Sequence, residues 1–154
     1  MKTILYFLLI FVGLVFQPQL ANSQPKSINC ASAPDNPGWK LISHDKDDGV
    51  YLFDPAKIKL ESFEKKTPPA TGNQMVQETK GRAFNACVAD YLMKDTTLIP
   101  KSWKTKEVGF PETIFEDGGG NQFFRCIKWD KRDGWCFGSV YLNDPYEDKV
   151  VAIK

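Results

Sequence analysis

The N-terminal segment constrains this chain more than any other feature of its sequence. After a single lysine, an almost unbroken apolar run extends from Ile4 to Phe16. Ala21 and Ser23 are small residues placed as a secretory cleavage site requires. The run is shorter than the roughly 20 residues that a membrane-spanning helix needs. Residues 1–23 are therefore predicted to be a cleaved signal peptide, which leaves residues 24–154 as an exported chain with no membrane span.

The charge of the chain is balanced, with 20 Lys and Arg against 19 Asp and Glu. Nucleic-acid binding needs a concentrated basic excess, so no nucleic-acid partner is expected. No Asn-x-Ser/Thr acceptor occurs, although such sites are common in secreted eukaryotic proteins. Together with the short leader, this absence favours the periplasm or cell surface of a bacterium.

All four cysteines follow the leader, at Cys30, Cys87, Cys126 and Cys136. An even number of cysteines in an exported chain predicts two disulfides, and three pairings remain open. Cys126 and Cys136 would face each other across a hairpin whose loop is Asp130–Arg132. A two-residue turn at Asp133-Gly134 would instead put them out of register. A zinc site is disfavoured because there is no C-x-x-C pair and only one histidine, so neither a metal nor a cofactor is expected.

Two hairpins give the clearest local patterns. In the first, strands at Trp39–His44 and Val50–Phe53 flank the polar turn Asp45–Gly49. In the second, strands at Gln122–Trp129 and Trp135–Leu142 flank Asp130–Gly134. Residues 24–38, rich in Ser, Asn and Pro, are predicted to be an irregular lead-in.

The other segments give weaker patterns. A helical turn is predicted at Asp54–Lys57, a strand at Ile58–Glu64, a loop at Thr67–Asn73, a flexible turn at Gly118–Asn121 and an edge strand at Val150–Ile153. Gln74–Met93 shows no 3.6-residue period and contains Gly81, so it is predicted to form two extended segments. Asp95–Glu112 is polar and contains Pro100 and Pro111, which predicts mostly loop. The predicted fold is one β-rich α+β domain over residues 39–154, with an antiparallel sheet of hairpins, little helix and disulfide bonds.

No motif predicts catalysis. His44 is the only histidine, it lies beside Asp45, and no nucleophile elbow accompanies it, so it is interpreted as a solvated turn residue. The aspartates at 45, 47 and 48 resemble part of a calcium loop, but Ala56 stands where an EF-hand needs glutamate. Paired carboxylates alone can hydrolyse glycosides, and the candidate acids are Glu107, Glu112, Glu116, Asp117 and Asp133.

Aromatic and basic side chains form the more distinctive group. Lysines alternate with a tryptophan in residues 101–106, which would suit a polyanion. The second hairpin holds more aromatic side chains than one face of a two-stranded ribbon can bury. Tyr and Trp are favoured contacts at protein interfaces. The candidate binding surface therefore comprises Lys101, Trp103, Lys104, Lys106, Trp129, Trp135 and Tyr141.

Four short segments carry a resemblance to a known family: Trp39–Ile42, Val50–Asp54, Pro55–Ile58 and Phe84–Cys87. Together they resemble the opening strands and a later cysteine-bearing strand of the surface-adhesin protein E family. The resemblance implies a small exported bacterial protein that binds host matrix and serum proteins. The family typically ends in a short helix that bears the partner cysteine, whereas this chain ends in an aromatic hairpin with two cysteines and has Cys30 in addition.

The sequence therefore predicts a non-enzymatic exported binding protein, adhesin-like or periplasmic, whose partner is a host matrix protein or an envelope protein. The alternative is an exported inhibitor or immunity protein against an envelope-acting hydrolase, with the Asp130–Gly134 turn as its inserted loop. A carboxylate-only glycoside hydrolase is the third hypothesis.

Overall fold

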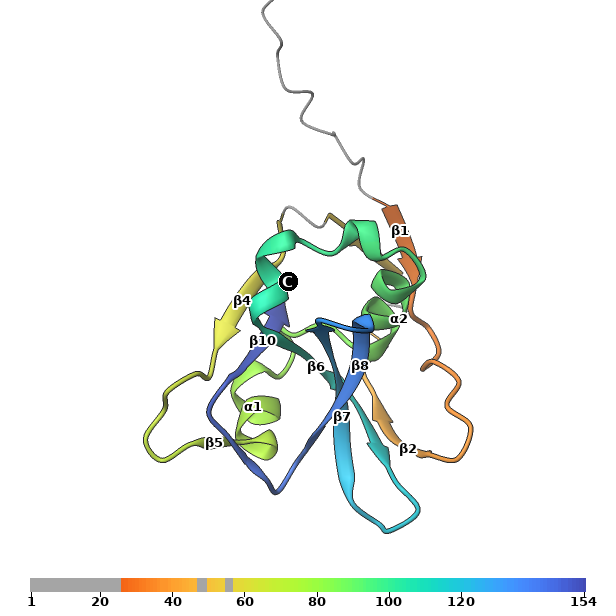
Figure 1. The fold of residues 1–154 in the computed structure, drawn as a ribbon. Helices are drawn as coiled ribbons and strands as arrows, with labels where there is room; N and C mark the ends of the chain where they lie inside the picture. Colours follow the sequence, from red (N-terminus) through yellow and green to blue (C-terminus); the bar gives the residue numbers. More distant parts are fainter. Residues whose placement is uncertain (1–25, 47–49, 55–56) are drawn as a thin grey trace, which may run out of the picture.

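The computed structural model describes residues 26–46, 50–54 and 57–154 (Figure 1). The predicted signal peptide, most of the Asp45–Gly49 turn and the middle of the predicted turn at Asp54–Lys57 lie outside these ranges. The described chain is β-rich, as predicted. None of its helices is long and apolar enough to cross a bilayer.

A six-stranded mixed sheet forms the centre of the fold, in the order β4-β10-β6-β7-β8 with β2 beside β6. Its strands are β2 (Lys40–His44), β4 (Lys59–Ser62), β6 (Glu107–Glu116), β7 (Gln122–Asp130), β8 (Gly134–Tyr141) and β10 (Lys149–Ile153). The predicted second hairpin is present as β7 and β8. The sheet is mixed rather than purely antiparallel because β10 runs parallel to β6. β10, predicted to be an edge strand, lies between β4 and β6.

The predicted first hairpin does not form, although both of its strands exist. β2 pairs with β6, while β3 (Val50–Phe53) pairs with β1 (Lys26–Asn29) in a separate two-stranded sheet. The Trp39 ring, just before β2, packs edge-on against Phe123 at 4.8 Å between centroids. Pairing with β6 thus brings the Trp39 ring onto the central sheet. A local β2–β3 ribbon would leave this ring exposed. A third small sheet joins β5 (Ala70–Thr71) to β9 (Pro145–Tyr146).

Residues 74–93, predicted to be extended, are mostly helical. α1 (Gly72–Thr79) starts with a capping box in which Thr71 and Gln74 satisfy each other's backbone N–H groups. α2 (Ala86–Lys94) starts at Asn85, whose side chain accepts a bond from the Cys87 N–H. Each helix is so short that its apolar period is hard to detect, and the break between them obscures it further. The 3₁₀ turns η3 (Thr96–Leu98) and η4 (Lys101–Thr105) follow α2.

The strand β6 is the element that the sequence predicted least well, since its first half was predicted to be loop. Pro111 misled the prediction, because proline is rare inside a sheet. In the structure it lies where the β6–β7 register shifts, between Phe110 and Phe115, so the ladder accommodates it at an irregularity. Gly109 allows close packing there, because a Cβ at this position would lie 2.7 Å from the Phe124 ring.

The helices cover opposite faces of the sheet. α1 contributes Met75 to a buried cluster with Phe124 and Val140. α2 contributes Val88 and Leu92 to a second cluster with Ile127. Since side chains alternate between the faces of a strand, Phe124 and Ile127 of β7 point in opposite directions. η4 lies on the α2 side and buries Trp103 in the same cluster as Ile127.

One disulfide is present, and the expected second one is not formed. Cys30 and Cys87 are bonded and tie the lead-in to α2, whereas Cys126 and Cys136 are free. The loop of the β7–β8 hairpin is residues 131–133, one residue later than the loop that would place these cysteines opposite each other. Cys126 therefore pairs with Gly138, and Cys136 pairs with Lys128.

We expect native alkylation to distinguish the two free thiols. Burial raises the pKa of Cys126 to about 12, so this thiol is neither accessible nor ionised at neutral pH. Cys136 is only partly buried. Iodoacetamide at pH 8 should label Cys136 in the folded protein and both thiols after denaturation, as measured by peptide mass spectrometry. A Cys126–Cys136 disulfide in material purified from its own compartment would contradict this assignment.

Candidate functional site

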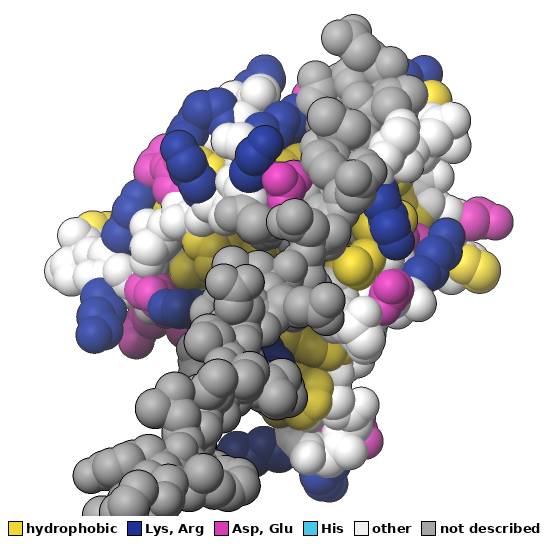
Figure 2. Space-filling view, turned by 90° about the horizontal axis from the view of Figure 1, so that it is seen from above, with side chains coloured by type: hydrophobic (Ala, Val, Ile, Leu, Met, Phe, Trp, Pro, Cys, Tyr) yellow, Lys and Arg dark blue, Asp and Glu magenta, His cyan; other side chains and the backbone are white. Residues whose placement is uncertain are grey.

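The predicted lysine–tryptophan cluster is only partly on the surface. Trp103 is 3% exposed and belongs to the core, so it offers no contact to a ligand. Lys106 Nζ lies 2.7 Å from the Glu64 carboxylate, which neutralises it locally. Lys101 and Lys104 are exposed. In the view from above, Lys and Arg side chains gather over part of this face, with acidic side chains among them (Figure 2).

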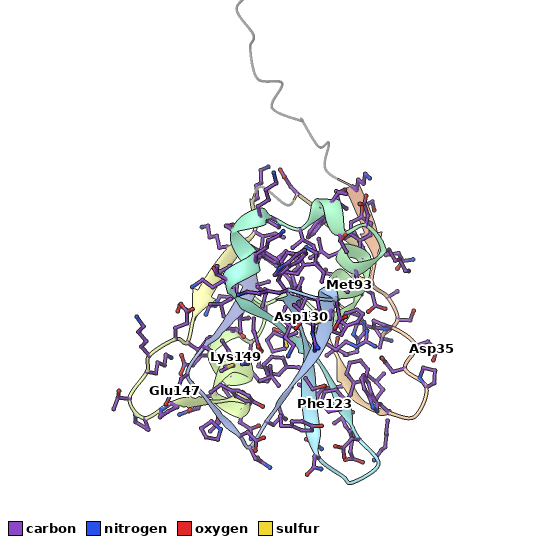
Figure 3. All side chains as sticks on the ribbon, viewed as in Figure 1. Asp35, Met93, Phe123, Asp130, Glu147 and Lys149 are labelled. Atoms are coloured by element: carbon purple, nitrogen blue, oxygen red, sulfur yellow. A yellow bond between two sulfur atoms is a disulfide. The ribbon has the colours of Figure 1, made fainter. Side chains whose placement is uncertain are left out.

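The remaining predicted residues divide between the two ends of the β7–β8 hairpin. At the turn end, Trp129 and Trp135 meet edge to face at 5.4 Å, and Lys104 Nζ lies 3.6 Å from the Trp129 ring centre. At the other end, Tyr141 packs half-buried against Phe123 at 5.5 Å. Figure 3 labels Asp130 and Phe123 at these opposite ends of β7. The structure thus brings Lys104 together with two tryptophans and leaves Tyr141 outside this group.

The most exposed apolar surface lies elsewhere, around β2. Among the described residues the exposed large hydrophobic side chains are Trp39, Leu41, Ile42 and Phe137, at 40%, 48%, 38% and 40% exposure. The first three are consecutive or nearly so, and we call them the β2 strip. Sequence reasoning assigned them to an ordinary hairpin. The available signal was the pair Leu41-Ile42, because two adjacent residues of a regular strand cannot both face the core.

A bulge shapes the β2 strip. Leu41 pairs with Phe115 and Ser43 with Ile114, so Ile42 is an extra residue without a counterpart on β6. β2 pairs with no other described strand, so its second edge is open within the described chain. The strip therefore presents apolar side chains beside a strand edge that a partner can reach.

The Trp39 ring is held by a buried cation. The Arg125 guanidinium carbon lies 5.6 Å from the Trp39 ring centre and 4.7 Å from that of Phe137. Arg125 is ion-paired with Asp90, and its Nε has no hydrogen-bond partner among the described residues. Burial lowers the pKa of Arg125 and raises the pKa of Asp90. In each case the charge of the partner shifts the pKa in the opposite direction, by less. The guanidinium therefore lies over both rings while it is ion-paired with Asp90.

Hydrogen bonds within the fold hold the His44 ring at both nitrogens. Its Nδ1 lies 2.8 Å from Thr113 Oγ1 and its Nε2 lies 2.9 Å from the Cys30 carbonyl oxygen. A carbonyl only accepts, so Nε2 donates to Cys30, which leaves Nδ1 to accept from the Thr113 hydroxyl. Both ring nitrogens are satisfied within the fold, which differs from the solvated turn histidine that the sequence predicted.

A groove of about 490 Å³ lies between α1, the end of β2 and the middle of β6. Val76 and Ile114 supply apolar walls, and Asp45 and Glu112 supply carboxylates. Glu112 Oε1 accepts a 2.6 Å hydrogen bond from the Gly81 N–H. Burial and, to a smaller extent, the nearby Asp45 charge raise the pKa of Glu112. The groove borders the end of β2 at Ser43–Asp45, next to the β2 strip, and its lining also includes Lys80, so it is a hollow with apolar walls and charges of both signs.

The other candidate acids are dispersed. Glu107 is paired with Lys149 at 2.9 Å and Glu116 with Lys40 at 3.2 Å. Asp117 accepts hydrogen bonds within its own turn. Of the five acids considered for glycoside hydrolysis, Glu112 alone lines the groove. In the described ranges, no group of three or more His, Cys, Asp and Glu side chains is placed to hold a metal ion.

Comparison with known proteins gave no match: no family model, no curated protein and no solved structure resembles the chain significantly. The resemblance to the surface-adhesin protein E family therefore stays a prediction.

We expect Glu112→Gln to make the fold less sensitive to pH. A carboxyl whose pKa is raised in the folded state costs free energy when it ionises, and this cost disappears as the pH falls through the folded pKa. The variant should therefore be more stable than wild type at pH 7, by about 0.5 kcal/mol after solvent screening, and this advantage should disappear by about pH 4. Urea denaturation at both pH values measures the difference. The exposed Glu147→Gln is the control, and an equal change in both variants would refute the assignment.

Proposed function

We propose that this chain is a non-enzymatic exported binding protein whose partner, a host matrix or envelope protein, binds at the β2 strip and the adjoining groove. The observation that carries the proposal is the exposure of Trp39, Leu41 and Ile42 on an open strand edge. Exposed apolar groups that are contiguous and border polar surface are typical of protein interaction sites.

The surface is suited to binding because it is already ordered. Trp39 packs edge-on against Phe123 and at a tilt against Phe115, while part of the residue stays exposed. The Arg125 guanidinium lies over the same ring. Leu41 and Ile42 are fixed by pairing with β6 and by the bulge. Binding of a partner would therefore cost little conformational entropy in this surface, which favours affinity.

The groove offers a second contact area at the end of β2. Val76 and Ile114 supply its apolar walls, and Asp45, Glu112 and Lys80 line it with charges of both signs. We therefore propose that the partner presents apolar side chains to the β2 strip and a polar segment to the groove.

Site-specific photocrosslinking tests this surface. With p-benzoylphenylalanine in place of Leu41, we expect a discrete covalent adduct in cells that produce the protein. The adduct should be lost when Ile42→Glu is added, because a buried charge opposes apolar contact. The matched control places the same photoreactive residue at Glu147, which is exposed and belongs neither to the β2 strip nor to the groove lining. Intact cells can then be treated with protease. An adduct that survives this treatment and is released by osmotic shock would indicate a periplasmic complex. An adduct that the protease destroys would indicate a complex at the cell surface. No adduct at position 41, or equal yields at both positions, rules the surface out.

The inhibitor hypothesis has one supporting observation, the order of the Asp130–Gly134 turn. Asp130 accepts hydrogen bonds from the N–H groups of Arg132 and Asp133 at 2.7 and 3.1 Å, and these bonds lower the pKa of its carboxyl. A loop fixed in this way enters an enzyme cleft at small entropic cost. If the turn inhibits an envelope hydrolase, adding the protein to an envelope extract should reduce lytic activity, and Asp130→Ala should restore it. Unchanged lysis with wild-type protein would reject the hypothesis.

A further inference from the structure

A polar pocket of about 230 Å³ lies at the end of the β7–β8 hairpin opposite its turn. Asn121 and Gln122 line one side of it, and Tyr141, Asn143 and Asp144 line the other. The turns that carry these residues, between β6 and β7 and between β8 and β9, both lie at the lower end of the sheet in Figure 1. The pocket shares no lining residue with the β2 strip or the groove, so it is a separate site.

Hydrogen bonds fix the turn on one side of the pocket. The Asp117 Oδ1 accepts from the N–H groups of Gly119 and Asn121 at 2.8 and 2.9 Å. Bonds from the Asn121 backbone and side chain lower the pKa of Asp117, so its carboxylate is ionised at neutral pH and only accepts. The Asn121 Nδ2 group donates to both carboxylate oxygens at 3.3 Å. The Asn121 Oδ1 is therefore the atom of this amide that is left to accept from a ligand.

The other side of the pocket is fixed to the start of α1. The Asn73 N–H donates to the Leu142 carbonyl at 2.8 Å, and the Gly72 N–H donates to the Asp144 carbonyl at 3.3 Å. The Asn73 Nδ2 group donates to Asn143 Oδ1 at 3.0 Å, which leaves the Asn143 Nδ2 group to donate to a ligand. The Asp144 side chain is exposed. This side therefore offers an amide donor and a carboxylate acceptor on a backbone that is already ordered.

The Tyr141 ring adds an apolar surface beside these polar groups. It packs half-buried against Phe123, which Figure 3 labels at this end of β7, at 5.5 Å between ring centres. Its hydroxyl bonds to Asp117 and contributes to the lowered pKa of that carboxyl. The ring is thus held both by packing and by its polar tip. Tyr141, which the sequence predicted to be a binding residue, therefore belongs to this pocket and not to the tryptophan pair at the opposite end of the hairpin.

We propose that the pocket binds one neutral sugar ring. Each hydroxyl of a sugar both donates and accepts, and the C–H groups of its ring form an apolar face that can pack against an aromatic ring. The pocket offers the complementary set: acceptors on Asn121 and Asp144, a donor on Asn143 and the ring of Tyr141. Its volume is below the range of about 300–1,000 Å³ that is typical for drug-sized ligands, so it suits a single ring.

The same groups disfavour an ion as the occupant. A calcium ion takes about six to eight oxygen ligands, whereas the Asn143 Nδ2 group would turn its hydrogens toward the cation. The Asp144 carboxylate in turn repels an anion, including the carboxylate of an acidic sugar. A ligand with uncharged hydroxyl groups satisfies the donor and the acceptors together.

Saturation-transfer NMR on the chain from residue 24 tests the proposal. The probes are glucose, galactose, mannose and N-acetylglucosamine, each as the free sugar and as both methyl glycosides. We expect saturation of at least one probe, strongest at the C–H protons of one ring face. Asp144→Ala should weaken binding about tenfold, because a hydrogen bond to a charged group is lost. Glu147→Ala, which removes an exposed carboxylate of the same segment outside the pocket, is the matched control and should leave binding unchanged.

Amide signals and added ions complete the test. In the ¹⁵N-labelled chain, the side-chain NH₂ signals of Asn121 and Asn143 should shift with the same probe, in EDTA as well as in calcium chloride. Binding of one methyl anomer would identify the ligand as part of a glycan, and binding of the free sugar alone would identify a free monosaccharide. Saturation of no probe, equal weakening in both variants, or binding that requires calcium would overturn the proposal. Crosslinking at the β2 strip is measured separately, so either proposal can fail alone.

Discussion

The irregularity of β6 at Pro111 determines the rest of the architecture. Before it, Glu107–Gly109 pair with β10, and after it, Thr113–Glu116 pair with β2. β7 follows the whole length of the other side of β6, with a register shift where the strand bends. One strand therefore has two different neighbours on the same side. Because β10 fills the first half, β2 is confined to the second half and remains a short strand with one open edge.

The confinement of β2 explains why the domain has an ordered but exposed aromatic ring. Trp39 enters from the lead-in, which the Cys30–Cys87 disulfide ties to α2. The ring covers Phe115 and Phe123, so part of it belongs to the core. Arg125, buried and paired with Asp90, takes the place of an apolar neighbour beside it. A buried ion pair is a poor source of stability, and here the same guanidinium also lies over the rings of Trp39 and Phe137.

The sequence predicted those elements whose pairing is local. The β7–β8 hairpin follows from alternation around an Asp- and Gly-containing turn, and it is present. β2 and β3 were predicted as strands, but their partners were wrong because the competing contact, Trp39 on Phe123, joins residues 84 positions apart and has no local signature. The two helices were missed because each is two turns long, and β6 was missed because proline masked it. The β2 strip could have been inferred only from the adjacent pair Leu41-Ile42.

The three edges of the central sheet differ in how they are protected, and this difference determines how a partner can reach each of them. β4 carries Lys59 and Glu61, and Glu61 is ion-paired with Arg82, so charge protects that edge. β2 is short and bulged. A partner can therefore contact its side chains more readily than it can pair with it in a long hydrogen-bonded ladder. β8 has neither charge nor bulge and is open over several residues.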